Sequence, residues 1–214
     1  MGYFPLFVDL KDKNILIVGG GKVAFRKILK LIPFEPKIII VAPEICCELE
    51  RLLKENKSLI YKKKRVEIDD IKNAFIVISA TNDKSVNNIV ATVCKENNIF
   101  VNSVDDFENC SFIFPALVKK GEFIAGLSTS GKAPDVAAYL KTVTEQAIPE
   151  NLEEVIENLG LLRQELKSQI TEQSVRAKII HELLEFYKNK NFLLSFGELR
   201  NEMNNLIESI SIKN

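Results

Sequence analysis

A triple glycine near the start of the chain is the strongest chemical signal in the sequence. An apolar segment, residues 15–18, runs directly into it, and a helical pattern follows. Read as G-x-G-x-x-A, the frame consists of Gly19, Gly21 and Ala24. The first glycine allows a tight turn, the second lets the backbone approach a pyrophosphate, and the small third residue lets the helix pack on the strand. The run therefore predicts a dinucleotide-phosphate site, and the alternative interpretation is a tight turn that binds nothing.

Polar residues also follow the other predicted strands, at the edge where open α/β sheets bind their ligands. Residues 80–83 read Ala-Thr-Asn-Asp, and residues 103–106 read Ser-Val-Asp-Asp. A carboxylate such as Asp105 could take or hold a proton there during a redox step, and the alternative is a turn or cap residue. Residues 128–130, Ser-Thr-Ser, could bind carboxylates or phosphates at a helix start, and the alternative is ordinary helix capping.

The end of the second predicted strand bears on the choice of cofactor. When a site holds a free ribose, an acidic residue usually ends that strand. Here Pro43 occupies the end, and Glu44 falls just beyond it. Because no arginine sits in the same segment to meet a 2′-phosphate, NAD is favoured over NADP.

The elements that must position these residues alternate between strand and helix through the first half of the chain. Their rhythm predicts an α/β fold with a Rossmann-like, doubly wound parallel sheet. The expected strands are residues 15–18, 37–41, 59–62, 74–79 and 99–102, and the expected helices are 22–31, 45–56 and 83–97.

The pattern changes after residue 110. Short strands at 111–115 and 123–128 are expected to flank a hairpin turn, and a helix follows at 134–147. From residue 151 the apolar spacing predicts helices only. Asn151 with Glu154 resembles a capping box for the first of them, and Ser195 with Glu198 caps the third. The predicted domains are residues 1–113, 114–148 and 149–214.

Composition limits the classes of function. The 214 residues are 46% hydrophobic and 27% charged, and 29 basic residues balance 29 acidic ones. A net charge of zero argues against a global field for nucleic acid. No apolar run approaches the roughly 18 residues that span a membrane, and the N-terminus lacks a signal-peptide pattern, so a cytoplasmic location is expected.

The remaining chemically interesting residues have plain interpretations. The single histidine, His181, and four cysteines without C-x-x-C spacing exclude an ordinary zinc site, so buried, reduced thiols are expected. The basic run at residues 62–65 is expected to be a solvated strand edge, and the alternative is a docking patch for an acidic substrate. The cysteines are Cys46, Cys47, Cys94 and Cys110.

A longer series of motifs is more specific than the glycines alone. It extends over residues 1–145. Its members are Tyr3-Phe-Pro-Leu-Phe7, Val18-Gly-Gly-Gly-Lys-Val-Ala24 with Arg26-Lys27, Val41-Ala-Pro43, Ala80-Thr-Asn-Asp83, Val101-Asn102 with Val104-Asp105, Ser111-Phe-Ile-Phe-Pro-Ala116 and Ser128-Thr-Ser-Gly-Lys-Ala-Pro134. In content and order the series resembles the precorrin-2 dehydrogenase family, which also forms the N-terminal part of siroheme synthases.

The resemblance implies an enzyme of siroheme biosynthesis, within porphyrin biosynthesis, that oxidises precorrin-2 to sirohydrochlorin with NAD as the hydride acceptor. It implies that Asp105 is the catalytic residue and that the site has no resident metal. The implied cofactor-binding residues are Gly19, Gly21, Lys22, Val23, Pro43, Thr81, Asn82, Asp83 and Asn102. The implied substrate-binding residues are Ser128, Thr129, Ser130 and Lys132.

The same resemblance implies a homodimer. Its fold would be the Rossmann-like α/β domain, then a small α+β dimerisation region, then an all-helical C-terminal domain that covers the cleft. Precorrin-2 is a tetrapyrrole octacarboxylate, which scattered lysines suit without a globally basic protein. Where many relatives have arginine in the helix after the serine-rich loop, this chain has Lys141, which loses the bidentate fork.

Three alternatives stay open beside the dehydrogenase. Some family members also insert ferrous iron, whereas others leave that step to a separate chelatase, and the dehydrogenase alone is preferred here. An NAD-sensing regulatory module would share the first half of the chain but would normally show an acidic residue ending the second strand. A dehydrogenase for a different small substrate is the third.

Overall fold

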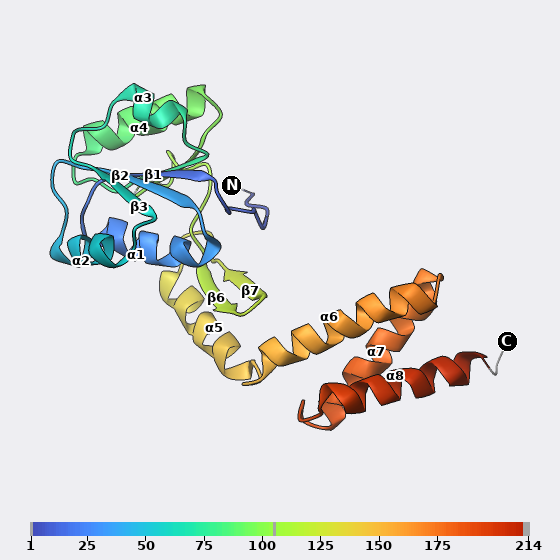
Figure 1. The fold of residues 1–214 in the computed structure, drawn as a ribbon. Coiled ribbons are helices and arrows are strands. Elements are labelled where there is room, and N and C mark those ends of the chain that lie inside the picture. The colour runs from blue at the N-terminus through green and yellow to red at the C-terminus, as the bar shows by residue number, and fades with distance from the viewer. Residues whose placement is uncertain (1, 105, 212–214) are drawn as a thin grey trace. The chain divides into compact units, whose positions relative to one another are not determined.

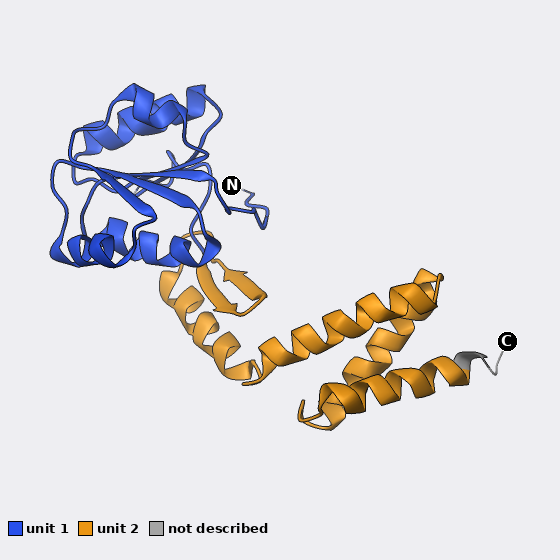
Figure 2. Cartoon of the chain, in the orientation of Figure 1, with its two compact units in different colours: residues 1–115 blue, residues 116–214 orange. Residues whose placement is uncertain are grey.

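The computed structural model describes residues 2–104 and 106–211, so the predicted catalytic residue Asp105 lies outside the described residues. Contacts within the chain divide it into two compact units, residues 1–115 and 116–214 (Figure 2). Each unit contains its own strands, helices and buried hydrophobic cluster. The predicted further division at residue 148 stays a prediction.

A five-stranded parallel sheet forms the centre of unit 1, in the order β3-β2-β1-β4-β5 (Figure 1). The order runs outward from β1 in both directions, so the chain crosses over between β3 and β4 as it does in doubly wound folds. The predicted Rossmann-like α/β fold is confirmed. The strands are β1 (Asn14–Val18), β2 (Lys37–Val41), β3 (Leu59–Lys62), β4 (Ile76–Ser79) and β5 (Phe100–Ser103).

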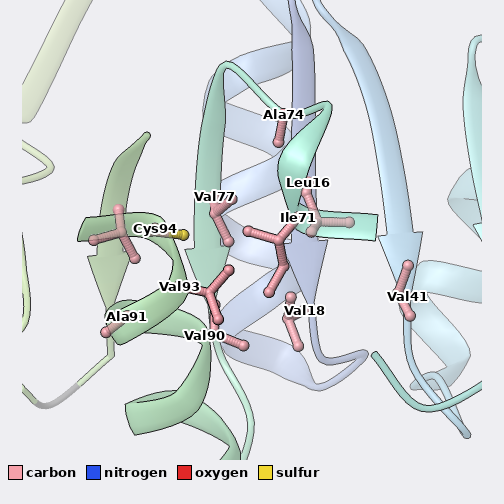
Figure 3. Close-up of a cluster of buried hydrophobic side chains, with 11 residues drawn as sticks. Leu16, Val18, Val41, Ile71, Ala74, Val77, Val90, Ala91, Val93 and Cys94 are labelled. Carbon is pink, nitrogen blue, oxygen red and sulfur yellow. The ribbon is translucent and has the colours of Figure 1, made fainter. Parts of the chain in front are cut away.

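Helices cover both faces of this sheet because successive apolar side chains of a strand point to opposite faces. Ile15 and Ile17 of β1 pack with α1 and α2, whereas Leu16 and Val18 pack with α3 and α4 (Figure 3). Each buried aliphatic side chain contributes roughly 1.5–3 kcal/mol, so the two clusters fix the helices to the sheet. The helices are α1 (Lys22–Leu31), the 3-10 helix η1 (Ile32–Phe34), α2 (Cys47–Glu55), α3 (Ile68–Lys72) and α4 (Lys84–Glu96).

Two details of unit 1 differ from expectation. The short helix α3 was not predicted because its five residues make too little periodic pattern, although Glu67 and Asp70 form a capping box at its start. The strand expected at residues 111–115 is wrong, since those residues form no strand and the next strand begins at Ala116. Ser111 and Phe112 instead make hydrogen bonds to Val101 and Asn102 of β5, and Pro115 has no N–H to give to a ladder.

Unit 2 begins with an antiparallel hairpin, and α5 contacts both of its strands. Three further helices enclose a separate cluster that includes Leu162, Leu183, Tyr187 and Met203. The elements are β6 (Ala116–Lys120), β7 (Phe123–Leu127), α5 (Pro134–Ala147), α6 (Leu152–Gln169), α7 (Gln173–Asn189) and α8 (Phe196–Ser211). The predicted helical C-terminal region is confirmed.

One of the two predicted helix caps forms. The Ser195 hydroxyl accepts from the Glu198 amide at 3.3 Å, and the Ser195 amide donates to the Glu198 carboxylate at 2.9 Å. The capping box expected at Asn151 is wrong, because its side chain makes no cap bond and instead donates to the Phe192 carbonyl. A contact distant in sequence has replaced the local one. Within the described part of the chain, no helix has the length and apolar character to cross a membrane.

The helical cluster generates a stability prediction. Leu183 has no exposed surface, so we expect Leu183→Ala to lower the free energy of unfolding by about 2–5 kcal/mol through lost burial and a residual cavity. Leu193→Ala is the matched control, because Leu193 is 78% exposed and its truncation should change stability by less than about 0.5 kcal/mol. Urea titration followed by circular dichroism measures both, and equal effects would contradict the assigned core.

Candidate functional site

The carboxyl ends of the five parallel strands in unit 1 lie along one edge of the sheet. The strand order reverses between β1 and β4, because β2 and β3 lie on one side of β1 and β4 and β5 on the other. Hydrogen bonds continue past the strand ends and keep the following loops in register. Gly19 donates its amide to the Val41 carbonyl at 3.0 Å, and Ala80 donates to the Val18 carbonyl at 2.7 Å. The loops after β1, β2 and β4 are therefore held side by side, in the place where this fold forms its ligand crevice.

At two of the three glycines, a side chain would clash with the backbone of a neighbouring loop. Gly19 has a φ of +113°, and a Cβ there would lie 2.3 Å from the Ala80 carbonyl oxygen. A Cβ on Gly20 would lie 2.3 Å from the Glu44 carbonyl oxygen, and Gly20 accepts a hydrogen bond from the Cys46 amide at 2.8 Å. These positions let the first turn approach its two neighbouring loops.

Gly21 has no such reason to be glycine. Its backbone is extended at the N-cap of α1, and a Cβ there would meet no described atom within 4 Å. No described side chain caps the helix start. The first turn of α1 thus presents its backbone N–H groups to an open space, which suits an anionic group. A side chain at residue 21 would enter this space, and the binding of a pyrophosphate there stays a prediction.

A buried asparagine holds the loop after β4. The Asn87 Oδ1 accepts from the hydroxyls of Ser79 and Thr81, both at 2.7 Å, and its Nδ2 donates to the Thr81 carbonyl at 3.0 Å. Asn87 is 6% exposed, and no sequence motif marks it as a residue of this site. Asn87 falls among the apolar positions of the predicted helix, and this placement could have identified it, because a buried amide needs specific hydrogen-bond partners.

The other predicted residues of this loop lie at the exposed rim. Asp83 caps α4, and hydrogen bonds from the Ser85 hydroxyl and the Val86 and Ser85 amides lower the pKa of its carboxyl. Asn82 is exposed beside it, as is Pro43 at the end of β2. Whether these residues touch a cofactor stays a prediction, although all of them lie at the same edge of the sheet.

Asn102 is tied down by its side chain. Its Oδ1 accepts from the Lys27 ammonium at 2.6 Å, and its Nδ2 donates to the Phe112 carbonyl at 3.0 Å. Lys27 also lies over the ring of Phe114, 4.3 Å from its centroid. Lys27 thus joins α1 to β5 and to the segment that follows it, a role that no sequence motif indicates. Asn102 therefore serves at least as a support for the strand end.

The end of β5 also carries an unusual hydroxyl. Ser103 Oγ is buried and has no hydrogen-bond partner within the described part of the chain. The Cys110 thiol donates to the Ser103 carbonyl at 3.2 Å, and burial raises the pKa of this thiol. Cys94 is buried with a pKa of about 11, but Cys47 is exposed, so the expectation that all four thiols are buried is wrong.

The serine-rich loop of unit 2 folds on itself. The Thr129 hydroxyl accepts from the Ala133 amide at 3.2 Å, and the Ser128 hydroxyl accepts from the Ser130 amide at 3.0 Å. Ser128, Ser130 and Lys132 are exposed at the start of α5. Their contact with a substrate stays a prediction.

Two of the four basic residues in the run 62–65 form ion pairs with an acidic side chain. Lys62 and Lys64 bind Asp70 at 3.2 and 2.8 Å. Burial alone would raise the pKa of Asp70, but the bonds from Lys64, Glu67 and Lys62 lower it overall. Lys62 and Lys64 therefore have a structural partner. Across the described residues, no group of three or more His, Cys, Asp or Glu side chains is arranged to hold a metal ion.

Comparisons with known proteins agree with this geometry. A family model described as putative NAD(P)-binding matches residues 6–116. The siroheme synthase of Buchnera aphidicola subsp. Acyrthosiphon pisum is 32% identical over 209 residues, which cover 95% of this chain and 44% of that protein. The siroheme synthase of Blochmanniella floridana is 40% identical over 172 residues, which cover 80% of this chain and 37% of that protein.

A solved structure is similar over its whole length. SirC, a precorrin-2 dehydrogenase, matches with a TM-score of 0.75 and 25% identity, over 96% of this chain and 100% of that one. The chain thus spans less than half the length of the siroheme synthases above but the full length of SirC. Because the family model covers more than half of the 214 residues, the chain belongs to this putative NAD(P)-binding family, as a module of the siroheme synthase and precorrin-2 dehydrogenase type.

Proposed function

We propose that this chain binds NAD and oxidises precorrin-2 to sirohydrochlorin in siroheme biosynthesis. The observation that carries the proposal is the open space at Gly21, at the start of α1 and at the switch point of the sheet. The similarity to SirC and to the siroheme synthases supports the choice of substrate. When bound, NAD supplies a nicotinamide ring that accepts the hydride.

In this proposal the residues of the chain bind the cofactor and hold the surrounding loops in position. The backbone of Gly21, Lys22 and Val23 holds the pyrophosphate at the start of α1. Asn87 fixes the loop that carries Thr81, and Lys27 fixes the strand end at Asn102. Both supports are side chains with specific partners, which keeps the edge of the crevice rigid. Thr81, Asn82, Asp83 and Pro43 complete the proposed cofactor side.

Oxidation of precorrin-2 removes two electrons and two hydrogens, one as a hydride and one as a proton. Bound NAD would supply the hydride acceptor, and the proton needs a base near the reacting carbon. We assign this role to Asp105, which follows β5 in the sequence and lies outside the described residues. On the substrate side, Ser128, Thr129, Ser130 and Lys132 offer hydroxyl and ammonium groups to the carboxylates of the tetrapyrrole.

A second copy of the chain is part of the proposal. Val136, Tyr139, Leu140 and Val143 are 40–67% exposed on α5. Their spacing puts them on one face of the helix, which makes an apolar stripe that a partner would cover. The adjoining two-stranded hairpin is marginal by itself and would also gain from a partner. We further propose a cytoplasmic location, which the free cysteines support, and a separate chelatase for iron insertion.

Gly21→Ala tests the cofactor site. The new methyl group would occupy the space of the pyrophosphate, so we expect NAD affinity to fall at least about tenfold. Stability should fall by less than about 1 kcal/mol, because the Cβ meets no described atom. Calorimetric titration of NAD and thermal unfolding measure the two effects.

Gly160→Ala is the matched control for that variant. Gly160 lies in α6, and a Cβ there also meets no described atom within 4 Å. The substitution should leave NAD affinity unchanged and raise stability by up to about 1 kcal/mol through helix propensity. If Gly21→Ala binds NAD as the parent does, the proposed pyrophosphate site is wrong.

Asp105→Asn tests the proton acceptor. The amide cannot take a proton, so turnover of precorrin-2 should fall about 100-fold or more, while the dissociation constant of NAD stays within about twofold. Asp106→Asn is the neighbouring control, because Asp106 accepts from the Asn109 amide at 3.2 Å and serves the turn. Absorbance of sirohydrochlorin reports the rate, and unchanged turnover in Asp105→Asn would remove this role.

Tyr139→Glu tests the dimer. A carboxylate in the middle of the apolar stripe would have to be buried without a partner, so we expect a dimer in the parent and a monomer in the variant. Ile89→Glu is the control, because Ile89 is similarly exposed at 59% but lies on α4 of unit 1. Sedimentation velocity gives the masses, and a monomeric parent would contradict the proposal.

A further inference from the structure

The outer side of β5 is an edge of the five-stranded sheet, because β5 stands last in the strand order. The chain turns back after β5 and makes hydrogen bonds along this edge. The Ser111 amide donates to the Val101 carbonyl at 2.8 Å, and the Ser111 hydroxyl accepts from the Val101 amide at 2.7 Å. Two residues further along β5, the thiol of Cys110 has the corresponding place beside the backbone of Ser103.

The Cys110 thiol lies within hydrogen-bond distance of residues at the end of β5 and just beyond it. Its sulfur accepts from the Ser103 amide at 3.2 Å and from the Asn102 Nδ2 at 3.6 Å. Its S–H can donate to the Ser103 carbonyl at 3.2 Å or to the Asp106 carbonyl at 3.1 Å. Burial raises the pKa of this thiol, so it stays protonated and able to donate. One side chain therefore joins the residues on both sides of positions 104 and 105.

The thiol follows a turn that is anchored on α4. The Asp106 carboxylate accepts from the Asn109 amide at 3.2 Å and from the Asn109 Nδ2 at 2.7 Å. Lys95 of α4 donates to the Asn109 Oδ1 at 2.8 Å and to the Glu108 carbonyl at 3.2 Å. Because Cys110 comes directly after this anchored turn, its sulfur has a fixed place from which to hold the end of β5.

The contacts of Cys110 bear on the chemistry through the residue that they flank. Ser103 and Asp106 stand on either side of Asp105, which lies outside the described residues and which the proposed function assigns as the proton acceptor. Since the thiol contacts the backbone on both sides, its removal would free both sides together. A misplacement of about 1 Å can cost about 100-fold in rate, so a small change there would be visible in turnover.

We propose that Cys110 is a positioning residue of the dehydrogenase: its thiol ties Ser103 to Asp106 and thereby sets the position from which Asp105 accepts the proton. The inference rests on the proposed function and deepens it at the same site. A thiol is a weak donor and a weak acceptor, and it offers both in one short, uncharged side chain. A serine hydroxyl also offers both, whereas alanine and valine offer neither.

Turnover of precorrin-2 by the full chain tests the proposal. Cys110→Ala should lower kcat about 10- to 100-fold and leave the dissociation constant of NAD within about twofold. Cys110→Val, which fills the space without a polar group, should show the same loss. Cys110→Ser should recover kcat to within about threefold of the parent, because the hydroxyl keeps a donor and an acceptor.

Cys94→Ala is the matched control, since this buried thiol of α4 packs in an apolar cluster and its loss should leave kcat unchanged. Circular dichroism confirms that each variant is folded at the assay temperature. In the Asp105→Asn background, Cys110→Ala should lower kcat by less than about a further twofold, because the residue that the thiol positions can no longer take the proton.

Three results overturn the proposal while the proposed function stands. They are an unchanged kcat in Cys110→Ala, an equal loss in Cys110→Ser, and the same loss from Cys110→Ala in the parent and in the Asp105→Asn background. If the parent does not convert precorrin-2, the proposed function fails, and the inference that rests on it fails as well.

Discussion

The close contact between the first glycine turn and the loop after β4 is the constraint on which the rest of the site depends. β1 and β4 are neighbours in the sheet, and the Ala80 carbonyl leaves no room for a side chain at residue 19. Because the turn is pressed against that loop, α1 must start at the crossover with its first amides facing outward. The place of the proposed pyrophosphate is therefore set by backbone packing before any ligand enters.

Two buried asparagines then support this edge from opposite faces of the sheet. Asn87 serves the face covered by α4, and Asn102 serves the face covered by α1. An amide carries a donor and an acceptor in one short side chain, so it can join several backbone and side-chain groups without burying a charge. These polar contacts position the loop after β4 and the end of β5 together with the apolar packing of Ala80 and Val101.

Much of unit 1 could be predicted from its sequence because its information is local. The apolar strands and the glycine frame specify a parallel sheet with a phosphate turn, and the chain forms both. Asn87 and Lys27 could not be found in the same way, because each acts through residues that the sheet brings together. The cap expected at Asn151 failed for the same reason, since a distant carbonyl competes for its side chain. The Ser195 cap formed as predicted because both of its partners lie within one turn.

Two of the four thiols, Cys47 and Cys94, differ in exposure, so their rates of chemical labelling can report on local unfolding. Cys47 lies at the start of α2 in contact with solvent, whereas Cys94 is sealed between α4 and the sheet with its pKa raised to about 11. Only thiolates react with alkylating reagents, so Cys47 is labelled in the closed protein and Cys94 only when the sheet and α4 separate. The rate at which Cys94 is labelled therefore measures how often unit 1 opens. Cys94 is therefore a built-in probe of local unfolding in unit 1.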